Sequence, residues 1–270
     1  MIREPRIVAK TQGFLVVYKP PLLHSAPLGD GDSLLGWCAE RYPETLSPRG
    51  PLPREGGLLH RLDYGTWGLV LVARTQEALE ALQGQQKKGN FVKEYGLLTG
   101  NTPRALLPGF PAPEANPSAA PPFAIESGFR PYGPGRKAAR PVIPKGGSPK
   151  KRLRIALDQG RPYKTEVLER QDLGNLLYFR VRIARAFRHQ IRCHLSWLGH
   201  PVLGDGLYGQ PEGNGDQPLM LKAQGLSFPD PFSGENRQYQ LPPIPEDALG
   251  QPGGNSEFPG LTARLKKDDP

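Results

Sequence analysis

The stretch HRLDYGTWGLVLVAR, residues 60–74, indicates more about this chain than any other. Its apolar half, from Gly68 to Arg74, is typical of a buried strand. Asp63 precedes that strand in a loop and stands close to the basic pair His60-Arg61. An isolated Asp before a strand is most often a turn residue. The same position also lets a carboxylate project into a cleft, where it can be presented to a polyanion.

Further strands and helices are expected on both sides of this stretch. Patterns typical of strands occur at residues 14–18, 91–98, 177–183 and 219–228. Ser33 and Thr75 are suitable N-caps for two amphipathic helices, and residues 187–198 form a third. Strands outnumber helices and do not alternate with them regularly. The sequence therefore predicts an α+β fold, with a mixed, largely antiparallel sheet and flanking helices.

Residues 101–160 differ in composition from the rest of the chain. They carry many of the 32 prolines and show no sustained periodicity. Between Arg130 and Lys164 basic residues prevail, and Asp158 is the only acid. Such a stretch cannot build its own core, so it is either a solvated insertion or a flexible arm that neutralises phosphates. We predict one domain over residues 1–246, with this insertion at about 101–160, and a disordered tail at 247–270.

Bulk composition narrows the class of partner. The net charge of +9 and the pI near 9.6 indicate an anionic partner, and nucleic acid fits better than a membrane surface. Cys38 and Cys193 form no CxxC pair and are expected to be buried free thiols. The N-terminus lacks a signal-peptide core, and no apolar run is long enough to span a membrane. A cytoplasmic protein is therefore expected.

Two further segments carry polar side chains of interest. In VKEYGLLTG, residues 92–100, Lys93 and Tyr95 share one face of an expected strand, and Glu94 lies on the other. In RHQIRCHLSWLGHPVLGDGLYG, residues 188–209, an expected helix presents His189 and Arg192. Taken singly, Tyr95 fits an ordinary strand aromatic and Arg192 an ordinary surface arginine. The histidines lack the i, i+4 spacing of a metalloprotease helix, so no metal site is expected.

Together, the three segments closely resemble the motifs of RluA-type pseudouridine synthases, which are HRLD-x-x-T-S-G-L, a K-x-Y strand and HQIR-x-HL-x-x-LGHP-x-LGD-x-x-YG. The resemblance extends from about Phe14 to Leu241, and FLVVYKP is similar to the family's first strand. It implies the pseudouridine synthase catalytic fold and isomerisation of uridine within RNA. Because that reaction involves no net oxidation, no cofactor is expected.

The resemblance also implies roles for individual residues. Asp63 is then the nucleophile, Arg192 pairs with it, and Tyr95 assists as a base or by stacking on the uracil. The expected RNA contacts are His60, Arg61, Lys93, Arg188 and His189. Attack on the ribose, attack on the uracil ring and a glycal route all remain open. The target uridine must leave its helix or loop, which implies base flipping.

Two positions depart from the family pattern. Trp67 stands where the family usually has Ser, which can reshape the pocket near Asp63. Phe187 takes the place of an arginine, and Arg185 or Arg188 is expected to supply the missing phosphate contact.

These departures leave an alternative open, an RNA-binding protein on the same scaffold without catalytic turnover. A third reading is a hydrolase that cleaves a glycosidic bond. Such enzymes usually need two acids across the bond, and only Glu55 accompanies Asp63 near the motif. The expected partner is structured ribosomal or transfer RNA, and the expected oligomeric state is a monomer.

Overall fold

The computed structural model describes residues 4–29, 31–115, 119–143, 155–209 and 218–244. The chain divides into two compact units, one of residues 1–96 with 221–270 and one of residues 97–220. Strand β4, Val92–Gly100, begins in the first unit and ends in the second. The tail predicted at 247–270 lies outside the described residues, and the single domain over 1–246 stays a prediction.

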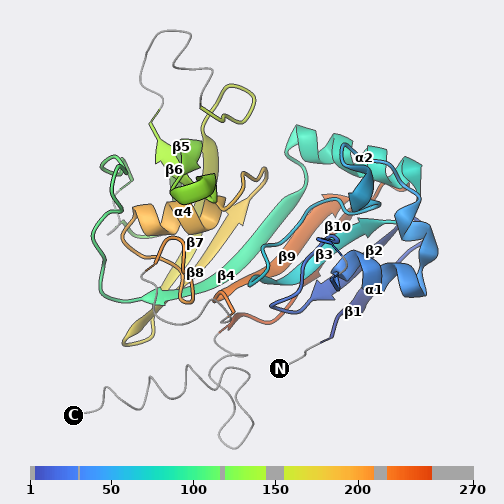
Figure 1. The fold of residues 1–270 in the computed structure, drawn as a ribbon, viewed down its shortest axis with the longest axis horizontal. Coiled ribbons are helices and arrows are strands. Elements are labelled where there is room, and N and C mark those ends of the chain that lie inside the picture. Colours follow the sequence, from blue (N-terminus) through green and yellow to red (C-terminus); the bar gives the residue numbers. More distant parts are fainter. Residues whose placement is uncertain (1–3, 30, 116–118, 144–154, 210–217, 245–270) are drawn as a thin grey trace, which may run out of the picture. The chain divides into compact units, whose positions relative to one another are not determined.

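The first unit is built on a mixed sheet (Figure 1). Strands β1 (Arg6–Lys10), β2 (Phe14–Lys19), β3 (Trp67–Ala73) and β9 (Leu221–Pro229) follow one another across the sheet, and β10 (Asn236–Gln240) also pairs with β9, off this path. Strands β3 and β9 are parallel, and the other neighbours are antiparallel. Every residue of β2 and β3 is buried, as expected for continuous apolar runs covered on both faces.

Two capped helices belong to the first unit, α1 (Leu34–Arg41) and α2 (Gln76–Lys88). Both predicted N-caps are confirmed, since Ser33 Oγ accepts the N–H of Gly36 at 3.0 Å and Thr75 Oγ1 accepts that of Ala78 at 3.2 Å. Helix α2 packs against β3 and β9. Two short 3₁₀ helices, η1 (Pro43–Leu46) and η2 (Pro53–Glu55), precede the segment that carries Asp63.

The second unit contains an antiparallel sheet. Its strands, in spatial order, are β8 (Leu176–Ile183), β7 (Tyr163–Asp172), β5 (Phe123–Tyr132) and β6 (Ala138–Val142). Helix α4 (Gln190–Trp197) packs against β6 and β7 (Figure 1). It begins three residues later than the sequence predicts, because His189 adopts a left-handed conformation with φ of +58°.

The described part of residues 101–160 contains regular structure, which the lack of periodicity in its sequence did not predict. Strands β5 and β6, joined by η3 (Pro134–Arg136), lie within this segment. Ile125 and Phe129 of β5 are fully buried. Strand β5 pairs with β7, which lies beyond the segment in sequence, and the Phe129 ring packs on Tyr163 and Phe187. The most basic part, residues 144–154, is outside the described residues.

The predicted fold class is confirmed, since the chain is α+β with a mixed, largely antiparallel arrangement of strands. Cys38 and Cys193 are buried and free, as expected. In the part of the chain that the structure describes, no helix is both long and apolar enough to cross a membrane.

Candidate active site

Asp63 lies half-buried in the loop between η2 and β3. Its carbonyl accepts the N–H of Thr66 at 3.0 Å, which closes a tight turn into β3. The preceding residue, Leu62, is tied to Ser25 in both directions: the Leu62 N–H donates to Ser25 Oγ, and that hydroxyl donates back to the Leu62 carbonyl, each at 3.0 Å. The backbone around Asp63 is therefore fixed from both sides.

Lys19, at the end of β2, lies within electrostatic range of Asp63 and is not among the residues predicted for the site. It is fully buried, and its Nζ donates to the carbonyls of Leu23 at 2.7 Å, Pro20 at 2.9 Å and Tyr64 at 3.4 Å. Burial lowers the pKa of Lys19 to about 7, and the negative charge of Asp63 opposes this shift. The signal in the sequence was a lysine at the end of a wholly apolar run, where a buried ammonium needs acceptors.

Tyr95 and Lys93 lie on one buried face of β4, with 6% and 2% of their surfaces exposed, and Glu94 between them is less buried. The predicted alternation is confirmed. Burial raises the pKa of Tyr95, and the charge of Asp63 raises it further, so the phenol is neutral at physiological pH. Tyr95 thus lies within electrostatic range of Asp63.

Lys93 lies inside the protein, and burial lowers the pKa of its ammonium to about 8. A buried ammonium cannot meet a phosphate at the surface, and only a group that enters the protein could contact it. The role of Lys93 as an RNA contact stays a prediction, and it requires a group of the RNA to enter the protein.

His60 and Arg61 face different surroundings. His60 Nε2 lies 3.4 Å from the Leu69 carbonyl, and its ring contacts Phe91. Burial and the charge of Lys93 lower the pKa of His60 to about 3, so the imidazole is neutral. The Arg61 side chain is 55% exposed and its Nη1 forms an ion pair with Glu55 Oε1 at 2.8 Å. Arg61 is thus exposed and accessible to RNA, whereas His60 is half-buried.

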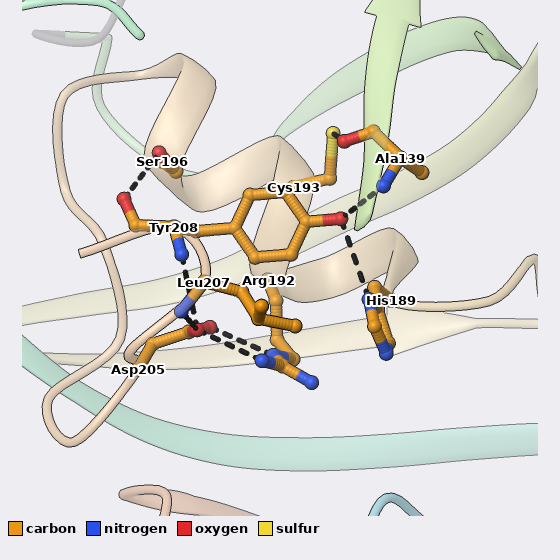
Figure 2. Close-up of polar contacts among 8 residues, drawn as sticks. All are labelled: Ala139, His189, Arg192, Cys193, Ser196, Asp205, Leu207 and Tyr208. Carbon is orange, nitrogen blue, oxygen red and sulfur yellow. Dashed lines mark hydrogen bonds and ion pairs between the residues drawn. The ribbon is translucent and has the colours of Figure 1, made fainter. Parts of the chain in front are cut away.

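Arg192 of α4 is held by Asp205 in the turn that follows the helix (Figure 2). Nε donates to Oδ2 at 2.7 Å and Nη2 donates to Oδ1 at 2.8 Å, a bidentate pair in which both side chains are buried. Oδ1 also accepts the N–H groups of Leu207 at 2.9 Å and Tyr208 at 3.2 Å. The pairing of Arg192 with Asp205 was not predicted from the sequence. The expected pairing of Arg192 with Asp63 joins residues of different units and stays a prediction.

His189 and Arg188 precede α4. His189 Nδ1 lies 3.4 Å from the Tyr208 hydroxyl, which in turn accepts the Ala139 N–H at 2.7 Å (Figure 2). Arg188 is exposed, and its Nη2 donates to the carbonyl of Lys137. Their contacts with RNA remain predictions.

Phe187, one of the two departures from the family pattern, has a packing role. Its ring stacks on Phe129 with centroids 4.7 Å apart and planes 2° apart. Of the two arginines expected to replace the missing contact, Arg185 forms an ion pair with Asp158 at 2.7 Å, and Arg188 is the exposed one. The other departure, Trp67, is 3% exposed at the start of β3.

Among the residues that the structure describes, no group of three or more His, Cys, Asp or Glu side chains could hold a metal ion. The buried His194 instead contacts two hydroxyl side chains inside the second unit. Ser127 Oγ lies 3.0 Å from its Nε2 and Thr165 Oγ1 lies 2.8 Å from its Nδ1.

Comparisons with known proteins agree with the motifs. A family model described as RNA pseudouridylate synthase matches residues 13–197. The chain is 30% identical over 228 residues to an uncharacterized RNA pseudouridine synthase of Chloroflexus aurantiacus, a match that covers 84% of this chain and 61% of that protein. It is 26% identical over 277 residues to the ribosomal large subunit pseudouridine synthase D of Vibrio parahaemolyticus, covering 97% of this chain and 71% of the relative.

A relative of similar length gives the same result. The dual-specificity RNA pseudouridine synthase RluA of Escherichia coli is 27% identical over 248 residues, which is 89% of this chain and 94% of that protein. The solved structure of human RNA pseudouridylate synthase domain containing 1 has a TM-score of 0.62 at 22% identity, covering 100% of this chain and 97% of that chain, and shows a shared fold. The chain therefore belongs to the RluA-type family of RNA pseudouridine synthases.

Proposed function

We propose that this chain isomerises specific uridines of structured RNA to pseudouridine, with Asp63 as the nucleophile. The observation that carries the proposal is the environment of Asp63. The HRLD loop holds this carboxylate half-buried, within electrostatic range of the buried Lys19 ammonium and the buried Tyr95 phenol. Family membership supplies the class of reaction that such a carboxylate would perform.

The chemistry requires a nucleophile and a proton transfer, and no oxidant. The bond from ribose C1′ to uracil N1 breaks, and a bond from C1′ to C5 forms. N1 gains a proton and C5 loses one. A carboxylate can divide this change into two easier steps by attacking the ribose or the uracil ring, and a glycal route is also compatible with the site.

The other site residues support Asp63 in this proposal. Because the Tyr95 phenol is neutral, its ring is better suited to stack on the uracil than to act as a phenolate base. Arg192 pairs with Asp63 while Asp205 engages its Nε and Nη2 and fixes the plane of the guanidinium. Asp63 and Arg192 belong to different units, and this pairing is part of the proposal.

The substrate is proposed from charge and from the names of relatives. Named relatives are a ribosomal large subunit enzyme and a dual-specificity RNA enzyme. We propose ribosomal or transfer RNA as substrate, bound by a monomer in the cytoplasm, with the exposed Arg61 and Arg188 among the contacts. A half-buried nucleophile requires the target uridine to leave its stack, so base flipping is part of the mechanism.

The state of Glu55, the other acid near the motif, argues against a hydrolase that cleaves a glycosidic bond. Glu55 is engaged by Arg61 at 2.8 Å. This ion pair already occupies the Glu55 carboxylate, which makes it poorly suited to be the second acid that such hydrolases use across the bond.

The test compares pseudouridine maps of total RNA from cells with and without the gene, read as carbodiimide-dependent stops of reverse transcription. Specific stops should vanish on deletion, return with the wild-type gene and stay absent with Asp63→Asn. Glu55→Gln, which alters a carboxylate of the same segment, is the matched control and should restore the stops. An unchanged map, with RNA binding retained by the purified protein, would indicate the non-catalytic alternative. Release of free uracil would indicate a hydrolase.

A further inference from the structure

The residue after the proposed nucleophile presents an aromatic ring to solvent. Tyr64 is 45% exposed, among the most exposed large side chains with apolar surface in the described chain. The ring of His24 lies beside it, with centroids 4.7 Å apart and planes inclined by 35°. The two rings come from separate loops of the same unit. Such a pair, with Tyr64 exposed and His24 half-buried, does little for the core.

The backbone behind the pair is held firmly. The Tyr64 carbonyl accepts the Leu22 N–H at 2.8 Å and faces Lys19 Nζ at 3.4 Å. The same ammonium donates to the Leu23 carbonyl at 2.7 Å, next to His24. Lys19 and Leu22 therefore fasten the loop of His24 to the loop of Asp63 and Tyr64. A planar surface fixed in advance loses little conformational entropy when it binds a ligand.

The charge around the pair suits a nucleic acid. Arg61, on the same loop, is 55% exposed although Glu55 pairs with its Nη1, and the chain carries a net charge of +9. Aromatic rings beside cationic side chains are the usual means by which proteins hold unpaired bases, since stacking accepts any base and cations hold the backbone. A uridine that turns toward Asp63 leaves the neighbouring base of its strand without a stacking partner, and Tyr64 is the next residue along the chain from Asp63.

We propose that Tyr64, backed by His24, stacks on the base that adjoins the target uridine in the RNA strand. This inference rests on the proposed function and adds a residue that selects the substrate. The ring, and not the hydroxyl, makes the contact. Tyr64 therefore contributes to binding and not to the chemical step.

The experiment is a double-mutant cycle on a synthetic RNA. The strongest site mapped with the wild-type protein on total RNA from the deletion strain is made as a stem–loop, and each neighbour of the target uridine is replaced in turn by an abasic nucleotide. Tyr64→Ala should raise KM roughly 10-fold on the intact RNA and leave kcat nearly unchanged. Tyr64→Phe should resemble the wild type. Removing the base on one side of the target uridine should raise the KM of the wild type by a similar factor. The same abasic RNA should raise the KM of Tyr64→Ala little further.

Matched controls separate this role from a structural one. The contacts of Tyr64 with Lys19 and Leu22 use its backbone carbonyl, so Tyr64→Ala retains them. Phe232→Ala removes another exposed ring of the same unit, 50% exposed, and should leave KM unchanged. Two results would overturn this inference and leave the proposed function standing. One is an unchanged KM for Tyr64→Ala. The other is a KM for Tyr64→Ala on each abasic RNA that equals the product of the two separate effects, because the ring and the base would then act independently. A wild-type protein that modifies no RNA would overturn the proposed function and this inference with it.

Discussion

Arg192 and Asp205 form a buried bidentate pair, with Nε to Oδ2 at 2.7 Å and Nη2 to Oδ1 at 2.8 Å (Figure 2). Only 7% of the Arg192 side chain and 0% of the Asp205 side chain are exposed. The pair joins helix α4 to the turn after it. It also fixes the orientation of a guanidinium that the family resemblance assigns to the catalytic site.

Removing the charge of Asp205 should therefore destabilise the protein. Asp205→Asn keeps a side-chain oxygen for the N–H groups of Leu207 and Tyr208, but removes the negative charge that faces the buried Arg192 guanidinium. We expect the free energy of unfolding to fall by about 3 kcal/mol, measured by urea denaturation. Glu40→Gln removes the acid of a pair whose side chains are 46% and 75% exposed, and serves as the control with little effect. An equal loss of unfolding free energy in the two variants would contradict a buried ion pair between Arg192 and Asp205.

Acid should destabilise the second unit through His194. Burial lowers the pKa of His194 to about 3, against about 6.5 in an unfolded chain. Between these values the unfolded chain binds a proton that the folded chain does not, so stability falls as pH falls from 6.5 toward 3. The contribution is about 1.4 kcal/mol per pH unit in the steep part of this window.

The variant His194→Gln removes that contribution. Its free energy of unfolding should depend less steeply on pH between 6 and 4 than that of the wild type. His60, whose pKa is also lowered to about 3, keeps part of the slope in both proteins. Parallel pH profiles for the two proteins would show that His194 is not buried in its neutral form.

Gly68 is required by the close approach of β3 to β9. Its φ is +117°, and a Cβ at this position would lie 2.2 Å from the carbonyl oxygen of Ala223, the residue paired with it. Gly68→Ala should cost at least about 2 kcal/mol of unfolding free energy. Gly84→Ala in α2 is the matched control, since a Cβ there meets nothing within 4 Å. It should stabilise the helix by about 0.5–1 kcal/mol. Urea denaturation of both variants checks the contrast in sign.

Tyr95 allows the two roles left open by the family resemblance to be separated. Burial, and then the charge of Asp63, raise the pKa of its phenol, which keeps it protonated at neutral pH. If the ring stacks on the uracil, Tyr95→Phe should retain most of the single-turnover rate and Tyr95→Leu should lose at least a factor of about 10. Equal losses in the two variants would instead assign the proton transfer to the hydroxyl.

The sequence by itself determined the elements that depend on local pattern. The apolar runs of β2 and β3, the caps Ser33 and Thr75 and the alternation of β4 all follow from the residues present, because side-chain periodicity and capping act over a few neighbours. The motifs around Asp63 and Arg192, which match the family pattern except at Trp67 and Phe187, likewise indicated the family. These features required no knowledge of distant parts of the chain.

Tertiary structure decided what depends on residues far apart in sequence. Strands β5 and β6 lie in a proline-rich segment with no clear period, and they form because β7 supplies a partner for β5. The fixed environment of Arg192 depends on a turn that returns Asp205 to the helix. The fully buried Lys19 is tolerated because carbonyls of two loops, from Leu23 and Tyr64, converge on its ammonium. In each case the energy comes from pairing polar groups out of water, and only the folded chain brings the partners together.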